Sequence, residues 1–328
     1  MIQPASSFRL EGFEPDNLLA FLALLGSLRA LEEAERGLCE DARWWPRASW
    51  DVDQPPWRPR LHLRRAVGRT ELVDRVEAGI AAFRAALDFE GRKMPDFAPN
   101  EYRALATAAV ERTDGRLRLD ALAALGTDQA LDEGATAATP LCLMSGQGHQ
   151  FFLQRLATVP FASSADEPGT SQARDNRPGD LECALFGVWE RKDVGSNVSF
   201  RWDPEEAARQ ALMAGDPTDR VFRLGTEKGA NRLAAIGLTV LPVVAGAQDR
   251  ALVPGFRVQD DGPAFHWPIW GEPASLAAIR ALLADLAIAE PGGLARFGVE
   301  TVMRAPIEAI GKFKNVGRAR PLLRDGRD

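Results

Sequence analysis

The chain has 328 residues, enough for one large or two ordinary domains with a substantial core. A hydrophobic content of 45% and a charged content of 26% are typical of a soluble globular protein. The net charge of −6 excludes a uniformly basic nucleic-acid coat but allows local basic patches.

The chain's three cysteines and three histidines lack the spacing of zinc ligands or of a disulfide framework. We therefore expect a reduced, cytoplasmic compartment and no cofactor. No basic segment followed by a cleavable apolar core opens the chain. The longest apolar run, residues 18–28, is too short to cross a bilayer, so no membrane contact is expected.

The N-terminal part predicts a short strand at residues 8–10 and a helix at residues 16–36. The leucine stripe of this helix is broad enough to predict nearly complete burial. Gly26 inside it indicates either close approach of another backbone or a tolerated glycine. Two further helices are predicted at residues 70–87 and 100–112, and residues 116–119 alternate like a strand.

Residues 43–69 combine four Trp with seven Arg against two Asp, a local charge of +5. Prolines predict a loop in the first half, and residues 61–64 resemble a strand. Arg interleaved with Trp suits phosphate contacts and base stacking, and Arg58 and Arg60 are our candidates for such contacts. The alternative is a loop anchored by buried Trp side chains, with solvated Arg around it.

Residues 139–152 predict an apolar strand, a tight glycine turn and a helix. Backbone N–H groups at such a turn can hold an anion, so Gln147 and His149 are candidate nucleic-acid contacts. The stretch has neither the Gly-Lys-Ser/Thr of a Walker loop nor the glycine spacing of a nucleophile elbow. A purely structural turn, or a catalytic His149 working with Asp203 or Glu205, remains an alternative.

Residues 161–180 are polar and nearly free of apolar side chains, which predicts a mobile loop or a loop ordered by a partner. We expect an α-rich N-terminal region at residues 1–160, which contains the Arg/Trp-rich loop. An α+β region with a basic tail is expected at residues 181–328. The two regions could equally form one integrated domain.

Residues 199–203 alternate in polarity and predict a half-buried strand that leads into a helix at Asp203 and Pro204. A second helix is expected from about residue 230 to residue 237. Arg201, Asn231 and Arg232 are therefore expected to share one polar surface.

The C-terminal part predicts alternating strands and one amphipathic helix, and it ends in a basic tail at residues 311–328. The strands are expected at residues 238–245, 251–258, 264–270 and 299–303, and the helix at residues 274–286. The candidate nucleic-acid contacts of the tail are Lys312, Lys314, Arg318 and Arg320. Helices and short, mostly antiparallel strands in irregular order indicate an α+β fold.

Six stretches in this order resemble a protein family encoded in type I-G (formerly I-U) CRISPR loci. They are residues 10–12, 15–31, 57–62, 146–149, 199–204 and 229–232. We identify this family as a small version of the large subunit of the Cascade effector complex. The resemblance covers nearly the whole chain, but its motifs are not catalytic signatures. Gln210 departs from the family pattern, which has an aromatic residue there, and this difference concerns packing only.

The resemblance implies a non-enzymatic subunit of an antiviral ribonucleoprotein complex. Such a subunit lies near the 5′ end of the guide RNA, recognises the target-flanking motif (the PAM) in double-stranded DNA and docks a helicase-nuclease. The implied partners are the guide RNA-loaded effector complex with its backbone and guide-processing subunits, the target duplex and the helicase-nuclease. The first alternative is a protein-binding adaptor or extension of the helicase-nuclease without direct DNA contact. The second is an uncharacterised enzyme that uses His149.

Overall fold

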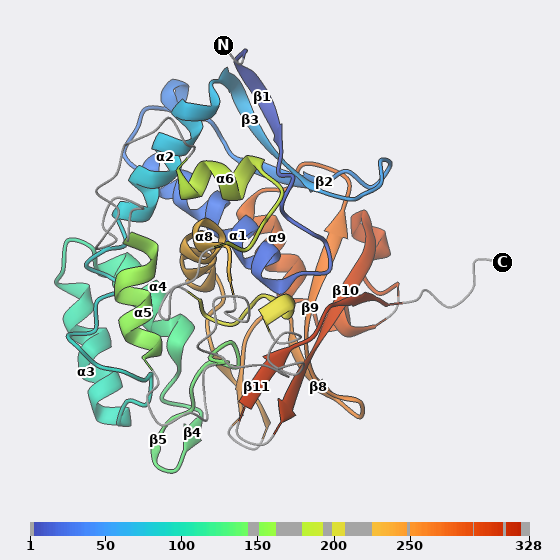
Figure 1. The fold of residues 1–328 in the computed structure, drawn as a ribbon. Coiled ribbons are helices and arrows are strands. Elements are labelled where there is room, and N and C mark those ends of the chain that lie inside the picture. Colours follow the sequence, from blue (N-terminus) through green and yellow to red (C-terminus); the bar gives the residue numbers. More distant parts are fainter. Residues whose placement is uncertain are drawn as a thin grey trace.

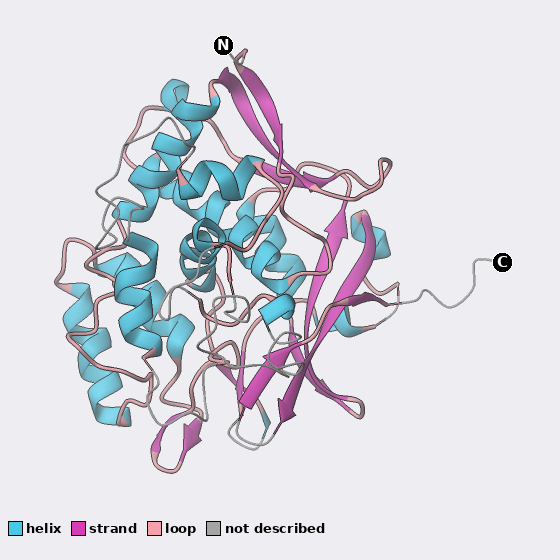
Figure 2. Ribbon diagram, viewed as in Figure 1, coloured by secondary structure: helices cyan, strands magenta, loops and turns pink. Residues whose placement is uncertain are grey.

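The structure is a computed structural model, and it describes residues 3–143, 151–161, 179–192, 199–206, 225–247, 250–290, 292–310 and 313–322. Its helices and small antiparallel sheets form a mixed α+β fold, which confirms the predicted fold class. Figure 1 shows most helices on one side of the molecule and the largest sheet on the other. Figure 2 separates the same two parts by secondary structure.

Helix α1 (Leu18–Ala34) lies at the centre of the fold and is buried on almost every side. The side-chain oxygen of Asn17 accepts the N–H of Ala20 and caps the helix. The helix predicted at residues 16–36 therefore forms, with the expected burial. None of the helices that the structure describes is long and apolar enough to span a bilayer.

Helices α1 and α8 (Lys228–Leu238) cross with their backbones in contact. A Cβ added at Gly26 would lie 1.8 Å from the carbonyl oxygen of Leu233, and one added at Gly237 would lie 2.0 Å from that of Leu22. Only glycine fits at both positions. Of the two interpretations of Gly26, close approach of another backbone is confirmed.

Some of the remaining helices cover α1 and α8, and α3 (Pro99–Val110), α4 (Gly115–Leu125) and α5 (Phe152–Thr158) form a separate group, which is below them in Figure 1. Helix α2 (Arg69–Ala81) packs on α1, and α6 (Asp180–Phe186) packs on α8. A further helix is α9 (Leu276–Ala284), and short 3-10 turns lie at Glu40–Ala42, Val159–Phe161, Leu286–Ala289 and Ala295–Phe297. Figure 1 places α3, α4 and α5 away from the N-terminal strands.

Two antiparallel sheets carry most of the described strands. The first has the order β1 (Ala5–Arg9), β3 (Pro59–Val67), β2 (Arg47–Trp50). The second has the order β11 (Phe313–Val316), β10 (Val299–Ile310), β9 (Gly262–Trp270), β8 (Phe256–Gln259), and β12 (Arg320–Pro321) also pairs with β10. Two small hairpins pair β4 (Leu131–Asp132) with β5 (Ala135–Thr136) and β6 (Val244–Ala245) with β7 (Ala251–Leu252).

The hydrophobic core is continuous through the described part of the chain, from Phe8 to Ala319. Helices α1 and α8 come from opposite sides of the boundary expected at residues 161–180, and they pack directly against each other. The two expected regions therefore share one core.

Four segments predicted as strands have other structures, among them residues 199–203. Residues 116–119 lie in α4, because Leu117, Ala121 and Leu125 are buried at helical spacing. Residues 141–143 form a turn, in which the N–H of Cys142 donates to the carbonyl of Thr139. Residues 238–245 contain the end of α8 and a turn, and only β6 at their end is a strand. Each of these segments was too short for its pattern to distinguish a strand from a helix or a turn.

Candidate nucleic-acid interface

The outward face of the sheet β1-β3-β2 is basic. Residues of β3 alternate between buried and exposed, so that Arg60, His62 and Arg64 face outward. The strand register places Arg47 of β2 opposite His62, and Arg9 of β1 opposite Arg60. All five side chains therefore belong to one face of the sheet.

One end of this face is neutralised by acidic residues. Asp51 accepts hydrogen bonds from Arg9 at 3.0 Å and from Arg60 at 2.6 Å. Arg58 is 14% exposed and donates to the backbone carbonyl of Glu11 at 2.7 Å. Arg58 and Arg60, selected from the sequence as phosphate contacts, are thus engaged in holding the preceding loop against the strands.

The other end of the sheet lacks this neutralisation. There, Arg43, Trp45, Arg47, His62 and Arg64 form what we name the Arg/Trp surface. In the described part of the chain, Arg43, Arg47 and Arg64 form no ion pair with a carboxylate. The sequence drew attention to this segment by composition, but it did not single out these five residues. The signal that could have done so is the alternation along residues 60–64.

Trp45 differs from its neighbours in the Arg/Trp-rich segment. Trp44 and Trp50 are 0% and 2% exposed, as the anchoring interpretation expected, whereas Trp45 is 44% exposed. Its backbone has φ of 53°, a left-handed conformation that costs a non-glycine residue about 1–3 kcal/mol. Such strain is found most often at functional sites. The guanidinium of Arg43 lies 5.7 Å from the centre of the Trp45 ring.

Two open hollows meet at Trp45 and Arg47. The first, of about 440 Å³, is also lined by His62, Leu63 and Arg64, and its described lining holds no carboxylate. The second, of about 540 Å³, has a mixed charge, because its other lining residues are Glu32, Glu35, Arg36, Gly37, Arg43, Pro46 and Ser275. The first hollow is therefore the better site for an anion.

His62 contributes hydrogen bonding rather than charge to the first hollow. Its Nε2 lies 2.9 Å from the hydroxyl of Ser49. Burial lowers the pKa of His62, the nearby Arg60 lowers it further, and Asp51 opposes both effects. The imidazole is therefore neutral at neutral pH, which leaves the positive charge of this site to arginine.

The polar surface expected from Arg201, Asn231 and Arg232 does not form, because two of the three side chains are buried. Asn231 is 0% exposed, and Arg232 is 1% exposed. Arg232 donates to Glu77 at 2.5 Å, to Asp180 at 2.7 Å and to a backbone carbonyl. A guanidinium satisfied in this way connects three segments of the fold and cannot reach DNA, so the prediction for Asn231 and Arg232 was wrong.

Residues 199–203 also differ from the predicted strand, since Arg201 has φ of 64°. The Phe200 and Trp202 rings stack 4.5 Å apart inside the core. Instead of a neighbouring strand, the side-chain oxygen of Asn231 accepts the N–H of Phe200 at 3.1 Å, and the N–H of Leu19 donates to the carbonyl of Trp202 at 3.0 Å. Arg201 itself is half-buried.

The same segment leads to a buried carboxyl group at Glu206. Burial raises its pKa to about 7, although hydrogen bonds from the hydroxyls of Ser199 and Thr226 act in the opposite direction. Thr226 also accepts a hydrogen bond from Asn231 at 2.9 Å. Asn231 thus belongs to a buried network that joins residues 199–206 to α8.

The candidates in the basic tail have different environments. Lys314 and Arg320 are exposed, and Lys312 lies outside the described residues. Arg318 pairs with Glu205 at 2.6 Å, with Asp16 at 2.9 Å and with Glu14 at 3.2 Å. Partial burial alone would lower the pKa of Arg318, but the hydrogen bonds to Asp16 and Glu205 raise it. Three carboxylates therefore occupy this guanidinium, which leaves it poorly placed to bind phosphate.

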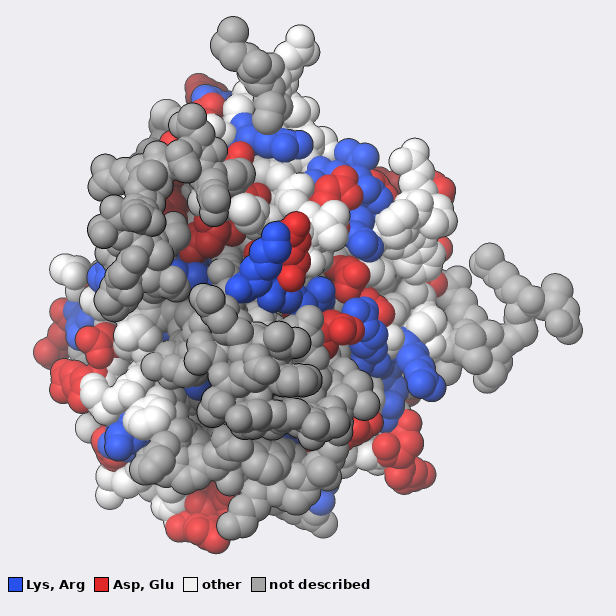
Figure 3. Space-filling view, in the orientation of Figure 1, with Lys and Arg blue, Asp and Glu red and all other residues white. Residues whose placement is uncertain are grey.

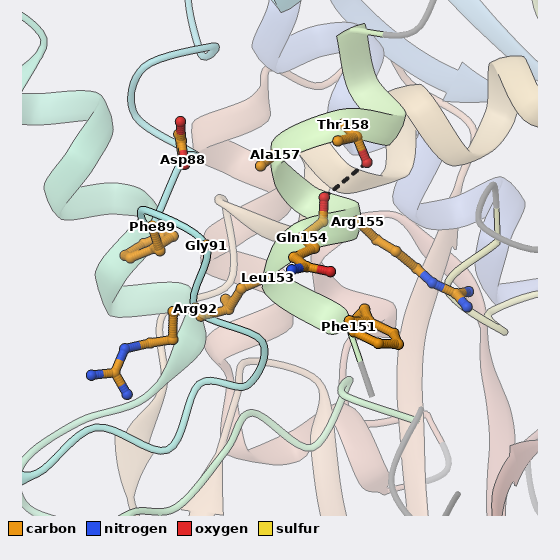
Figure 4. Close-up of a pocket in the computed structure, with 10 residues that line it drawn as sticks. All are labelled: Asp88, Phe89, Gly91, Arg92, Phe151, Leu153, Gln154, Arg155, Ala157 and Thr158. Carbon is orange, nitrogen blue, oxygen red and sulfur yellow. Dashed lines mark hydrogen bonds between the residues drawn. The ribbon is translucent and has the colours of Figure 1, made fainter. Parts of the chain in front are cut away.

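Gln147 and His149 also lie outside the described residues, so their expected contacts have no structural counterpart here. A hollow of about 530 Å³ lies between residues 88–92 and α5. Figure 4 shows Arg92 and Arg155 pointing away from each other on either side of it, and the hydroxyl of Thr158 bonded to the carbonyl of Gln154 within α5. Among the described residues that line this hollow, no acid and base are paired.

The charges on the described surface are interspersed. On the part of the face in Figure 3 that is not grey, Lys and Arg lie next to Asp and Glu. Within the described ranges, no group of three or more His, Cys, Asp or Glu side chains is placed to hold a metal ion. In comparisons with known proteins, no family model and no curated protein matches the chain.

Proposed function

We propose that this chain is a non-enzymatic, cytoplasmic subunit of a type I CRISPR antiviral effector complex. In this proposal it contacts double-stranded DNA beside the target through the Arg/Trp surface and docks the helicase-nuclease. The observation that carries the proposal is the placement of Arg43, Arg47 and Arg64 around an exposed indole, without carboxylate partners among the described residues, in a chain of net charge −6. Such cations bind phosphate independently of sequence, while guide–target pairing supplies the specificity.

The stretches that carry the family resemblance support this division of roles. Residues 15–31, 199–204 and 229–232 meet in the core, where Asn17 donates to Asp203 at 3.0 Å and Asn231 accepts from Phe200. Because these residues are buried, they are suited to define a shared fold. Residues 57–62 lead along β3 to the Arg/Trp surface, where the exposed residues are suited to bind a partner.

The test is a salt series of binding to a short DNA duplex, with the purified chain alone and with its guide-loaded complex. We expect affinity to fall steeply with salt and to increase with the complex and with a target-flanking motif. The variant Arg47→Gln/Arg64→Gln should lower the slope of log affinity against log salt by about 2, since each lost phosphate contact removes close to one unit.

The matched control is Arg103→Gln/Arg112→Gln, which removes the same charge from exposed side chains on and just after α3. Figure 1 places this helix far from the first sheet, so its salt slope should equal that of the unmodified chain. Absence of DNA binding in both settings, together with retained affinity for the helicase-nuclease, would exclude the proposed function and favour the adaptor.

A further inference from the structure

Trp45 is held in place by anchors on both sides of its strained backbone. The N–H of Trp44 donates to the buried carboxylate of Glu35 at 2.5 Å, and the carbonyl of Trp44 accepts the N–H of Arg64 at 2.7 Å. Pro46 on the other side is buried. The left-handed residue between them turns one indole into the core and the next one outward. A large aromatic ring fixed outside the core is available to a ligand at little cost in conformational entropy.

The surroundings of the ring favour a ligand with one flat apolar part and one anionic part. Arg43 lies over the ring and lines only the second hollow. The first hollow borders the same indole and contains Arg47 and Arg64, with no carboxylate among the described residues that line it. Its volume of about 440 Å³ is within the range of sites that hold small organic groups.

A nucleotide has this combination of parts, and whether its base is paired decides whether the base can reach the indole. Bases within a duplex are already stacked on both faces, so an indole on the protein surface cannot reach them. An unpaired base exposes a face, and stacking on an aromatic side chain contributes about 1–3 kcal/mol per base without regard to sequence. Neutral His62 can add a hydrogen bond in the same hollow.

We propose that the first hollow binds one unpaired nucleotide, with its base against Trp45 and its phosphate between Arg47 and Arg64. The inference rests on the proposed function and extends it from the duplex to the strand separated beside it. The shared chemistry is a single-stranded nucleotide, which either an opened DNA strand or the end of a guide RNA would supply.

The experiment compares labelled DNA probes that share one duplex and differ in a short unpaired arm, which is absent, normal or abasic. A fourth probe carries the arm as RNA. The unmodified chain should bind the normal arm about tenfold more tightly than the abasic arm, in line with one stacked base. The more tightly bound of the DNA and RNA arms identifies the source of the nucleotide.

Variants of Trp45 separate stacking from folding. Trp45→Asn removes the ring and tolerates the left-handed backbone, so the thermal midpoint should change little while the tenfold preference is lost. Trp45→Phe retains a stacking face and should keep most of the preference. Arg103→Gln/Arg112→Gln, on and just after α3, lies outside the Arg/Trp surface and should keep the tenfold preference.

Equal affinity for normal and abasic arms, with steep salt dependence for all probes, would refute the stacking site and leave the proposed function intact. Absence of binding to every probe would refute both. If Trp45→Asn instead weakened only binding to the helicase-nuclease, the hollow would be a protein dock and the inference would be wrong.

Discussion

Replacing Gly26 by alanine tests the central packing of the fold. The added Cβ would lie 1.8 Å from the carbonyl oxygen of Leu233, so α1 and α8 would have to separate by at least about 1.5 Å to reach normal contact. Overpacking of this kind costs roughly 1–3 kcal/mol, and here the obstacle is backbone rather than a movable side chain. Alanine recovers about 1 kcal/mol of helix propensity. We expect a net loss of about 2 kcal/mol in the free energy of unfolding.

Urea denaturation of the Gly26→Ala variant measures this loss, with the Gly68→Ala variant as the control. Gly68 precedes α2 with nothing within 4 Å of an added Cβ, so its variant should differ from the unmodified chain by less than about 0.5 kcal/mol. Gly237→Ala should lower the free energy of unfolding about as much as Gly26→Ala does. The double variant should lose less than the sum of the two single losses, because one separation of the helices accommodates both methyl groups. An unchanged or higher stability of Gly26→Ala would show that the two backbones are not in contact.

Two further predictions concern buried charge. Glu206 has a folded pKa of about 7, above its ordinary value of 4.5, so the folded state holds a proton that the unfolded state has released between these pH values. The stabilisation that comes from the raised pKa of Glu206 is therefore complete below about pH 4.5, and it is lost as the pH rises to about 7. Relative to Glu206→Gln, the unmodified chain should lose about 3 kcal/mol over this range in denaturation at several pH values, and parallel pH profiles would contradict the assignment. Arg232→Gln should lower the free energy of unfolding by about 3 kcal/mol or more, because Asp180 loses its buried partner. The DNA affinity of the folded protein should stay unchanged. A loss of DNA affinity without a loss of stability would instead place Arg232 in the interface.

The sequence was most informative where a pattern is local and long. The leucine stripe of α1 extends over several turns, and no strand could bury it, so the helix and its burial were both predictable. Residues 116–119 and 199–203 were too short to distinguish the two periodicities. In the second case Asn231, distant in sequence, supplies the hydrogen bond that a neighbouring strand would have made.

The site was only partly predictable for a related reason. Composition drew attention to residues 43–69, but which Trp is exposed depends on the left-handed backbone of Trp45 and on its anchor at Glu35. Arg232 has the same side chain as a phosphate contact. Its burial follows from Glu77 and Asp180, whose positions beside it no local pattern reveals.

The pairing of α1 with α8 also affects how the chain is made. About 200 residues separate the end of α1 from the start of α8. At a synthesis rate of about 5–20 residues per second, this almost fully buried helix leaves the ribosome roughly 10–40 s before the segment that covers it. During that interval a nascent chain exposes α1 on several sides. Chaperone capture of ribosome-bound intermediates should therefore depend on the N-terminal segment and should end once residues 228–238 emerge.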